Sequence, residues 1–259
     1  MTALFCLPLY IALVNAFKLS KDVVPNPLAF PLPPTLENVV KVVTASGGAF
    51  WTSLGLTVAI TLFSVLATML FSGMLAYSLA RSQGVAAKIV LGVLLLGLMI
   101  PQVVTLGPVV DVLRAIGLFQ TLPGLISFNV GGYMPFAVFL FYGFIRATSI
   151  ETEEAAALDG ASRFRTFWQV VFPQLAPVSA SVAIFLSVFV WNDFLSPLIL
   201  LGPFNGDTIT VGVYRSIGAY STDFGTLFAT MLLACIPVIV AYLLLQRQFV
   251  KGLTAGAVK

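Results

Sequence analysis

Histidine is absent from this chain of 259 residues, and only 9% of its residues are charged. The lack of histidine excludes Ser–His and Cys–His nucleophile pairs, histidine metal sites and imidazole proton relays. The scarcity of charge excludes an ordinary soluble globular protein, in which about 25% of residues are charged. The chain is instead 59% hydrophobic, which provides enough apolar surface for several membrane spans.

Cysteine is scarce as well, and the commonest phosphate-binding motif is missing. Cys6 and Cys235 lie in apolar runs, so we expect small buried hydrophobic residues and no disulfide framework. No Gly-x-x-x-x-Gly-Lys-Ser/Thr motif occurs, so the chain carries no phosphate-binding loop of that type. The small net charge of +3 does not indicate a nucleic-acid partner. The sequence predicts no catalytic residue, cofactor or metal site.

Long apolar runs predict a single all-α membrane domain, a polytopic bundle of six transmembrane helices. The first run begins without the positive leader of a signal peptide, and we interpret it as a transmembrane helix whose usual polar leader is missing. Five prolines between Lys18 and Phe50 predict a loop without regular helix, and a short interfacial helix is expected over 107–123. The predicted spans are 2–17, 51–80, 89–106, 124–145, 175–201 and 226–245.

The distribution of lysine and arginine predicts the orientation of these spans. Basic residues accumulate in cytoplasmic loops, and the side that carries the loop 148–173 holds eight of them against five on the other side. We therefore expect this loop and the C-terminus to be cytoplasmic. The eight are Arg81, Lys88, Arg146, Arg163, Arg165, Arg247, Lys251 and Lys259; the five are Lys18, Lys21, Lys41, Arg114 and Arg215.

The stretch EEAAALDGASRFRTFWQVVFP, from Glu153 to Pro173, concentrates charge between two apolar runs. Thr148 and Glu151 have the spacing of a capping box, which predicts the start of a helix. Glutamates at 151, 153 and 154 favour the positive end of that helix. The dipeptide Asp159-Gly160 predicts a sharp turn, and Pro173 predicts a kink or a new helix start.

Apolar side chains in this stretch recur at helical spacing and predict one continuous apolar face. One interpretation is an amphipathic helix that rests in the lipid headgroups. The other is a helix that docks on a protein, which the three glutamates favour because anionic lipid repels them. The apolar positions are Ala157, Ala161, Phe164, Trp168, Val171 and Leu175.

The spacing of the stretch resembles the cytoplasmic signature loop of bacterial ABC importer permeases. That signature reads Glu-Ala-Ala, three residues, Gly, nine residues, then Ile, any residue and Leu-Pro. Here Glu154-Ala155-Ala156 is followed at that spacing by Gly160 and by Val170-Val171-Phe172-Pro173. Val and Phe thus stand where Ile and Leu are usual, and Ile150 stands where the family often has proline.

The resemblance implies that the loop between the fourth and fifth spans is a coupling helix seated in a cleft of an ABC ATPase subunit. It also implies a bacterial inner-membrane location, a dimer of ATPase subunits, a second permease subunit in a heterodimer and an extracytoplasmic substrate-binding protein. ATP hydrolysis would then belong to a partner, and this chain would not be an enzyme. The implied coupling residues are Glu153, Glu154, Ala155, Ala156, Asp159, Gly160 and Arg163.

Three further stretches resemble the second membrane subunit of maltose-type importers. They read PPTLENVV, WNDFLSPLIL and GLTAGAVK. This resemblance implies a sugar, oligosaccharide or sugar-phosphate cargo. It also implies that the C-terminal Gly252–Lys259 reaches into the ATPase dimer.

Asp193 is the charged residue within the predicted spans, next to Asn192. An ionisable side chain in a span is costly and usually faces a cavity or a partner. Two interpretations stay open: a structural cap or helix–helix hydrogen bond near the interface, or a polar lining of the sugar path with Trp191 as an aromatic face. Further candidates for the path are Asn129, Tyr133 and Gln102.

Two other classes of membrane protein compete with the importer interpretation. An ion-coupled secondary transporter or a channel needs ion-binding or charged groups near the middle of the membrane and often has an internal repeat. An intramembrane enzyme needs a catalytic or metal-binding cluster in the spans. The sequence offers Asp193 alone, towards one end of a span, and no clear repeat.

Overall fold

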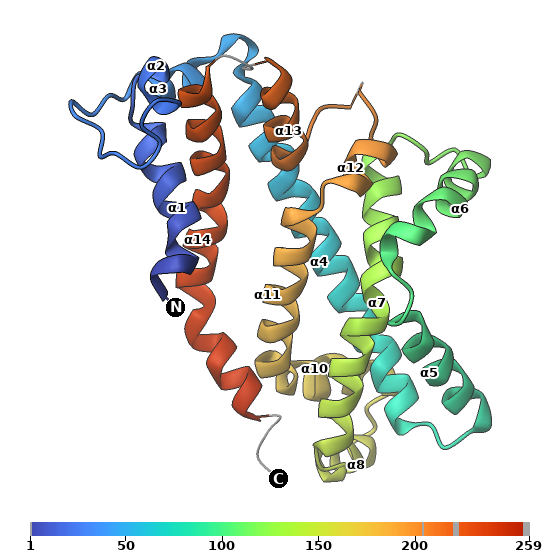
Figure 1. Cartoon of the computed structure of the whole chain (residues 1–259). Coiled ribbons are helices and arrows are strands. Elements are labelled where there is room, and N and C mark those ends of the chain that lie inside the picture. Colours follow the sequence, from blue (N-terminus) through green and yellow to red (C-terminus); the bar gives the residue numbers. More distant parts are fainter. Residues whose placement is uncertain (1, 204, 220–222, 256–259) are drawn as a thin grey trace. The chain divides into compact units, whose positions relative to one another are not determined.

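The computed structural model describes residues 2–203, 205–219 and 223–255, and within these ranges the secondary structure consists of helices without strands (Figure 1). This agrees with the predicted all-α class. The helices are α1 (Thr2–Ala16), α2 (Ser20–Val23), α3 (Glu37–Thr44), η1 (Ser46–Gly48), α4 (Ala49–Arg81), α5 (Val85–Gly97), α6 (Gln102–Ala115), α7 (Leu122–Ala147), α8 (Glu151–Leu158), α9 (Arg163–Thr166), η2 (Phe167–Val171), α10 (Phe172–Gln174), α11 (Ala176–Asn192), α12 (Leu195–Leu200), α13 (Ile209–Ala219) and α14 (Phe224–Ala255).

Three of the described helical segments are long and apolar enough to cross a membrane: α4, α7 and residues 224–241 of α14. Two bent pairs raise the number to five if each pair is one span, namely α5 with α6 and Arg163–Gln174 with α11. Cys6–Ala16 is a shorter apolar helix. Length and composition of the described helices thus support between three and five spans, and the count of six stays a prediction.

The predicted third span, 89–106, is not one helix. Helix α5 ends at Gly97, α6 begins at Gln102, and the two helix axes differ by 110°. Pro101 lies at this break, where its ring restricts the preceding residue and it lacks an N–H to continue the helix. Because α6 starts at the break, it also begins earlier than the interfacial helix expected from residue 107.

The predicted fifth span, 175–201, is also interrupted. Helix α11 ends at Asn192 and the six-residue α12 begins at Leu195. The oxygen Oδ1 of Asp193 accepts a hydrogen bond from the backbone N–H of Ser196 at 3.2 Å. The carboxylate therefore satisfies a donor in the first turn of α12, as residues preceding a helix commonly do.

The segment 18–50 contains helix, contrary to the prediction of a loop throughout. Pro25 to Pro34 lie outside helices as expected, but Glu37–Thr44 forms α3 because the proline run ends before it. Both cysteines are exposed within the chain, contrary to their predicted burial. In a membrane protein an apolar side chain is stable against lipid, so an apolar run does not by itself imply burial in protein.

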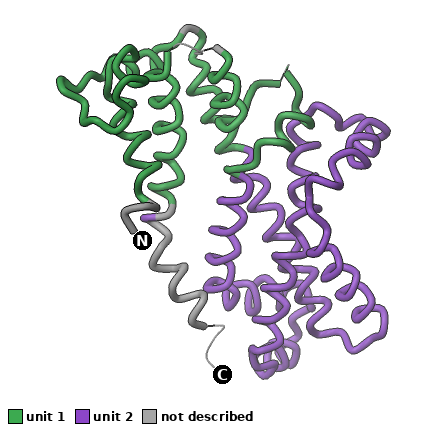
Figure 2. The backbone as a smooth tube through the Cα atoms, in the orientation of Figure 1, with its two compact units in different colours: residues 1–59, 191–241 green, residues 60–190, 242–259 purple. Residues whose placement is uncertain are grey.

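The chain divides into two compact units, 1–59 with 191–241 and 60–190 with 242–259 (Figure 2). The core of the second unit combines residues from α4, α7, the segment after Arg163, and α11. Phe141 and Val138 of α7 are fully buried in it. Its buried residues are Val65, Ala76, Leu79, Ala80, Ala137, Val138, Phe141, Ile145, Phe167, Val171, Leu175, Val182 and Leu186.

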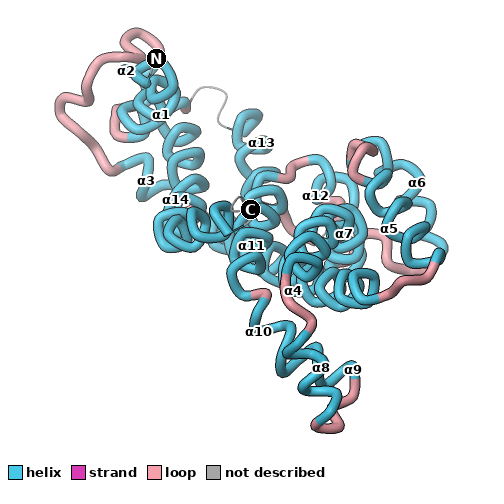
Figure 3. Tube along the Cα trace, turned by 90° about the horizontal axis from the view of Figure 1, so that it is seen from below, coloured by secondary structure: helices cyan, strands magenta, loops and turns pink. Residues whose placement is uncertain are grey.

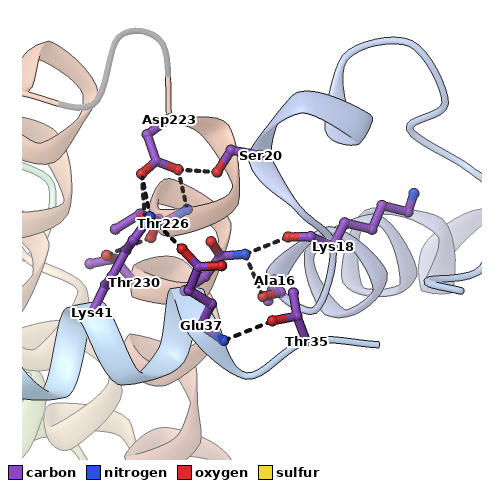
Figure 4. A network of polar contacts seen from close by, with 10 residues as sticks. Ala16, Lys18, Ser20, Thr35, Glu37, Lys41, Asp223, Thr226 and Thr230 are labelled. Atoms are coloured by element: carbon purple, nitrogen blue, oxygen red, sulfur yellow. Dashed lines mark hydrogen bonds and ion pairs between the residues drawn. The ribbon is translucent and has the colours of Figure 1, made fainter. Parts of the chain in front are cut away.

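Within the first unit, a polar network joins Asp223 and the first turn of α14 to α2 and α3 (Figure 4). Asp223 accepts hydrogen bonds from the hydroxyl of Ser20 and from the backbone N–H of Thr226, and it pairs with Lys41 at 3.5 Å. Burial alone raises the pKa of the Asp223 carboxyl, but these hydrogen bonds and the ammonium of Lys41 outweigh it, so the pKa lies below its usual value. The sequence analysis did not anticipate this network, whose partners lie far apart in the chain.

Candidate functional site

The connection between α7 and α11 contains the charged stretch, and its first helix begins differently from the prediction. The N-cap of α8 is Ile150, which makes no side-chain cap. The Thr148 hydroxyl donates to the Phe144 carbonyl at 3.0 Å, and Ser149 Oγ accepts from the Glu151 N–H at 3.2 Å. The predicted capping box is therefore wrong, because Thr148 is bonded back to α7.

Helix α8 stands out from the bundle of its own unit together with α9 (Figure 3). Its outward side chains are exposed, among them Glu151, Glu154 and Ala155, and Leu158 is 90% exposed. Glu154 makes no ion pair with any residue in the described ranges. Ala156, unlike Ala155, is half-buried. The helix thus presents a small surface of glutamate, alanine and leucine.

Glu153, by contrast, is bonded to the end of α4. Its carboxylate contacts the Arg81 guanidinium through Nε at 3.0 and 3.2 Å and through Nη2 at 2.7 Å. The two side chains are only 17% (Arg81) and 10% (Glu153) exposed. One predicted coupling residue is therefore held inside the chain.

A sharp turn ends α8 as predicted. Gly160 has φ of 80°, and its N–H donates to the Ala157 carbonyl at 3.0 Å while the Ala161 N–H donates to the Ala156 carbonyl at 2.9 Å. These two bonds form a Schellman motif, in which a residue with positive φ closes the helix. Asp159 is exposed beside the turn.

The chain then returns to α11 through a second helical segment. Ser162 caps α9 by accepting from the Arg165 N–H at 3.3 Å, and Phe167–Val171 is a π-helix that precedes Pro173. The axis turns by 76° before α11, which confirms the predicted kink. The predicted continuous apolar face is wrong, because the turn at Gly160 separates its two halves.

A cavity of about 420 Å³ lies between the end of α4, α8 and α9. Its apolar lining comes from residues such as Met74, Phe164 and Phe167, and its charged lining is mixed in sign. The charged residues are Arg81, Glu153, Glu154 and Arg163. The structure thus brings three predicted coupling residues, Glu153, Glu154 and Arg163, around one cavity.

The predicted path residues fall into two groups. Trp191 and Asn192 line an apolar cavity of about 520 Å³ in the first unit, together with Phe194 and Tyr214. The aromatic rings of Phe194 and Tyr214 pack 4.9 Å apart. Asp193 does not line this cavity, because its carboxylate faces α12 and its carbonyl accepts from the Thr210 hydroxyl at 2.8 Å.

The other three candidates belong to the second unit and have local roles there. Asn129 is buried and donates to Ser64 Oγ of α4 at 3.0 Å. Tyr133 stacks on Phe189 with ring centroids 5.9 Å apart. Gln102 lines a separate cavity of about 460 Å³.

Within the described residues, no group of three or more histidine, cysteine, aspartate or glutamate side chains has the arrangement of a metal site. The C-terminal residues 256–259, part of the predicted ATPase-contacting tail, lie outside the described ranges.

Comparison with known proteins identifies the family. The sequence model for the "binding-protein-dependent transport system inner membrane component" matches residues 69–255. The chain belongs to this family.

Among the permease's relatives, the multiple sugar-binding transport system permease protein MsmG of Streptococcus mutans is 34% identical over 99% of this chain and 92% of that protein. The melibiose/raffinose/stachyose import permease protein MelC of Bacillus subtilis is 36% identical over 78% of this chain and 74% of its own length. A chain from the crystal structure of a bacterial ABC transporter that imports the acidic polysaccharide alginate has the same fold, with a TM-score of 0.83 at 20% identity over 96% of this chain and 92% of that chain.

The family match includes α8, Gly160 and the residues of the Trp191 cavity except Leu9, but not α1 to α3. The protein is therefore an inner-membrane permease component of a binding-protein-dependent transport system, and the ion-coupled transporter and channel alternatives are not favoured.

Proposed function

We propose that this permease is the membrane subunit of an ATP-driven importer of sugars or sugar-like solutes and forms half of the translocation path. The exposed face of α8 carries the proposal, because a short helix standing out from its bundle offers a docking surface for an ATPase subunit. Ala155 and Ala156 are small, so α8 can seat deeply, and the exposed carboxylate of Glu154, which forms no ion pair with another described residue, is available to a cation of the partner.

The proposed topology has six spans, with α1, α4, α5, α7, α11 and α14 crossing the membrane. The loop 148–173 and the C-terminus are cytoplasmic in this arrangement, as the lysine and arginine distribution favours. A second permease subunit completes the path, and a substrate-binding protein delivers solute from the other side of the membrane.

Energy for transport comes from the partner in this proposal, because the chain has no phosphate-binding loop motif. Closure of the ATPase dimer around ATP moves the docked α8, and the spans change from inward-facing to outward-facing. Such a shift requires the nucleotide-loaded partner to make different contacts with the two states of the permease.

The docking proposal predicts that Glu154→Lys removes the ATPase subunit from the complex. The variant places a cation where the partner is expected to offer one, and repulsion across an interface costs several kcal/mol. The measurement is purification of the tagged permease from its native membrane, followed by quantification of ATPase subunits by mass spectrometry. Lys88→Glu in α5 is the control for a charge reversal away from α8. Equal recovery of ATPase subunits with both variants would contradict docking through α8.

The cargo proposal rests on the sugar-transport names of the relatives and on the aromatic lining of the Trp191 cavity. Trp191→Ala is expected to weaken the apparent affinity for the sugar about two- to tenfold, the effect of losing an aromatic stacking contact of about 0.5–1.5 kcal/mol. Trp191→Phe keeps an aromatic face, so its apparent affinity for the sugar should stay close to that of the parent. ATP-dependent uptake at increasing concentrations of each sugar in a panel measures both. Unchanged concentration dependence in the alanine variant would remove Trp191 from the path.

A further inference from the structure

Glu153 and Glu154 are adjacent in the sequence but differ in exposure and in their contacts. Glu154 is exposed, whereas Glu153 is paired with Arg81, at the last residue of α4. A carboxylate that already makes three short contacts with a guanidinium is a poor docking group for another protein, because a new partner would have to replace the existing pair.

We propose that Arg81 and Glu153 are positioning residues, which fix α8 to the end of α4 so that displacement of the docked helix is passed directly to α4. This inference rests on the proposed function, since it assumes that α8 docks on an ATPase subunit. It assigns Glu153 a different role from Glu154, although both belong to the charged stretch.

The geometry of the pair favours a rigid attachment. Both Nε and Nη2 of Arg81 contact the carboxylate, and a planar guanidinium bound at two nitrogens restricts the angle between its partners as well as their distance. Nη2 also donates to the Thr148 carbonyl at 3.4 Å, where α7 ends. One side chain of α4 therefore holds the end of α7 and the first turn of α8 together.

Helix electrostatics support the same assignment. Arg81 lies in the last turn of α4, where a cation stabilises the helix, and Glu153 lies in the first turn of α8, where an anion does. Each charge favours its own helix end, and the pair joins those two ends. The low exposure of both side chains also limits screening by salt.

The returning segment attaches to α4 at a second point. Phe167 is 2% exposed and packs on Tyr77 of α4, with ring centroids 5.5 Å apart. The returning segment also contacts α8 itself, since Gln174 Nε2 donates to Thr152 Oγ1 at 3.4 Å. Helix α4 thus contacts both α8 and the segment that returns from it. A displacement of the loop is therefore expected to displace the end of α4 as well.

The experiment uses the complete complex in vesicles and measures two quantities: ATPase subunits bound per permease, and solute taken up per ATP hydrolysed. Glu153→Gln should retain the ATPase subunit and lower uptake per ATP about tenfold, within the usual range of coupling between sites. The reversed pair Arg81→Glu with Glu153→Arg should restore part of the uptake that Arg81→Glu alone loses, because the ion pair returns while both charges then oppose the dipoles of their helices. Glu154→Gln, at the neighbouring position, is the matched control. It should lower the number of ATPase subunits bound per permease more than the uptake per ATP hydrolysed.

Three outcomes overturn the proposal. Uptake per ATP in Glu153→Gln equal to the parent would mean that the pair does not link the motions. Loss of the ATPase subunit from Glu153→Gln would make Glu153 a docking residue. Failure of the reversed pair to restore any uptake would mean that the Arg81–Glu153 contact does not transmit the motion. Arg81→Lys keeps the positive charge but not the two-nitrogen contact, so uptake per ATP equal to the parent in this variant would show that the two-nitrogen contact is not needed. If the parent complex itself binds no ATPase subunit, the proposed function fails instead.

Discussion

Gly124→Ala is expected to destabilise the permease by about 1–3 kcal/mol, the usual cost of overpacking a filled site. Gly124 is buried in the first turn of α7. A Cβ atom there would overlap the backbone carbonyl oxygen of Leu118 and lie 3.2 Å from Thr121 Oγ1. Since the obstructing atom is backbone, no side-chain rotation relieves the overlap.

The hydrogen bonds at this helix start make the site rigid. Thr121 Oγ1 accepts from the Gly124 N–H at 3.1 Å and donates to the Leu118 carbonyl at 2.7 Å. A displacement of Leu118 by the new methyl group therefore also disturbs the cap of α7. The loss of this cap adds about 1 kcal/mol to the expected destabilisation.

The unfolding midpoint of the purified protein in detergent measures the effect, and Gly143→Ala in the same helix is the control. A Cβ at exposed Gly143 meets nothing within 4 Å. Alanine should therefore stabilise α7 there by about 0.5–1 kcal/mol through its better helix propensity. A Gly124→Ala protein as stable as Gly143→Ala would contradict the close approach of Leu118.

Local patterns in the sequence predicted the charged stretch well. The acidic start of α8, the turn at Gly160 and the kink at Pro173 each depend on residues within a few positions of one another. Propensity, capping and backbone freedom act over this range. The predicted capping box was wrong because the Thr148 hydroxyl is bonded back to α7, and the N-cap of α8 is Ile150, which makes no side-chain cap.

Contacts across long sequence separations were not predictable from local patterns. Arg81 and Glu153 are 72 positions apart, and nothing in either neighbourhood distinguishes Glu153 from Glu154 as the inward residue. The same holds for Ser20 and Asp223, which are 203 positions apart. Such pairs can be identified only once the packing of the helices is known.

Apolar runs predicted that helices are present, but not where each helix is interrupted. Asp193 was correctly singled out as unusual within a span, and one of its two interpretations, a structural cap, agrees with the bond to the Ser196 N–H. The run 175–201 nevertheless read as one helix, because hydrophobicity alone does not report where a helix ends. The predicted span 89–106 likewise ran across Pro101, where the chain changes direction by 110°.

Gly160→Val is expected to lower ATP-driven uptake about five- to thirtyfold, the factor that corresponds to about 1–2 kcal/mol. Gly160 has φ of 80°, and the left-handed conformation costs other residues about 1–2 kcal/mol. A β-branched residue is especially unsuited to it. Valine therefore shifts the turn away from the conformation that closes α8 and starts α9.

Gly160→Asn separates this backbone effect from the addition of a side chain, because asparagine adopts the left-handed conformation more readily. A Cβ at this position meets nothing within 4 Å, so neither substitution clashes with a neighbour. We expect the asparagine variant to retain most of the uptake, with both variants present in the membrane at parental amounts. Equal loss in the two variants would mean that position 160 tolerates no side chain at all, as at an interface where the turn itself is covered by the ATPase subunit. Equal retention of uptake in the two variants would mean that coupling does not depend on how readily residue 160 adopts the left-handed conformation.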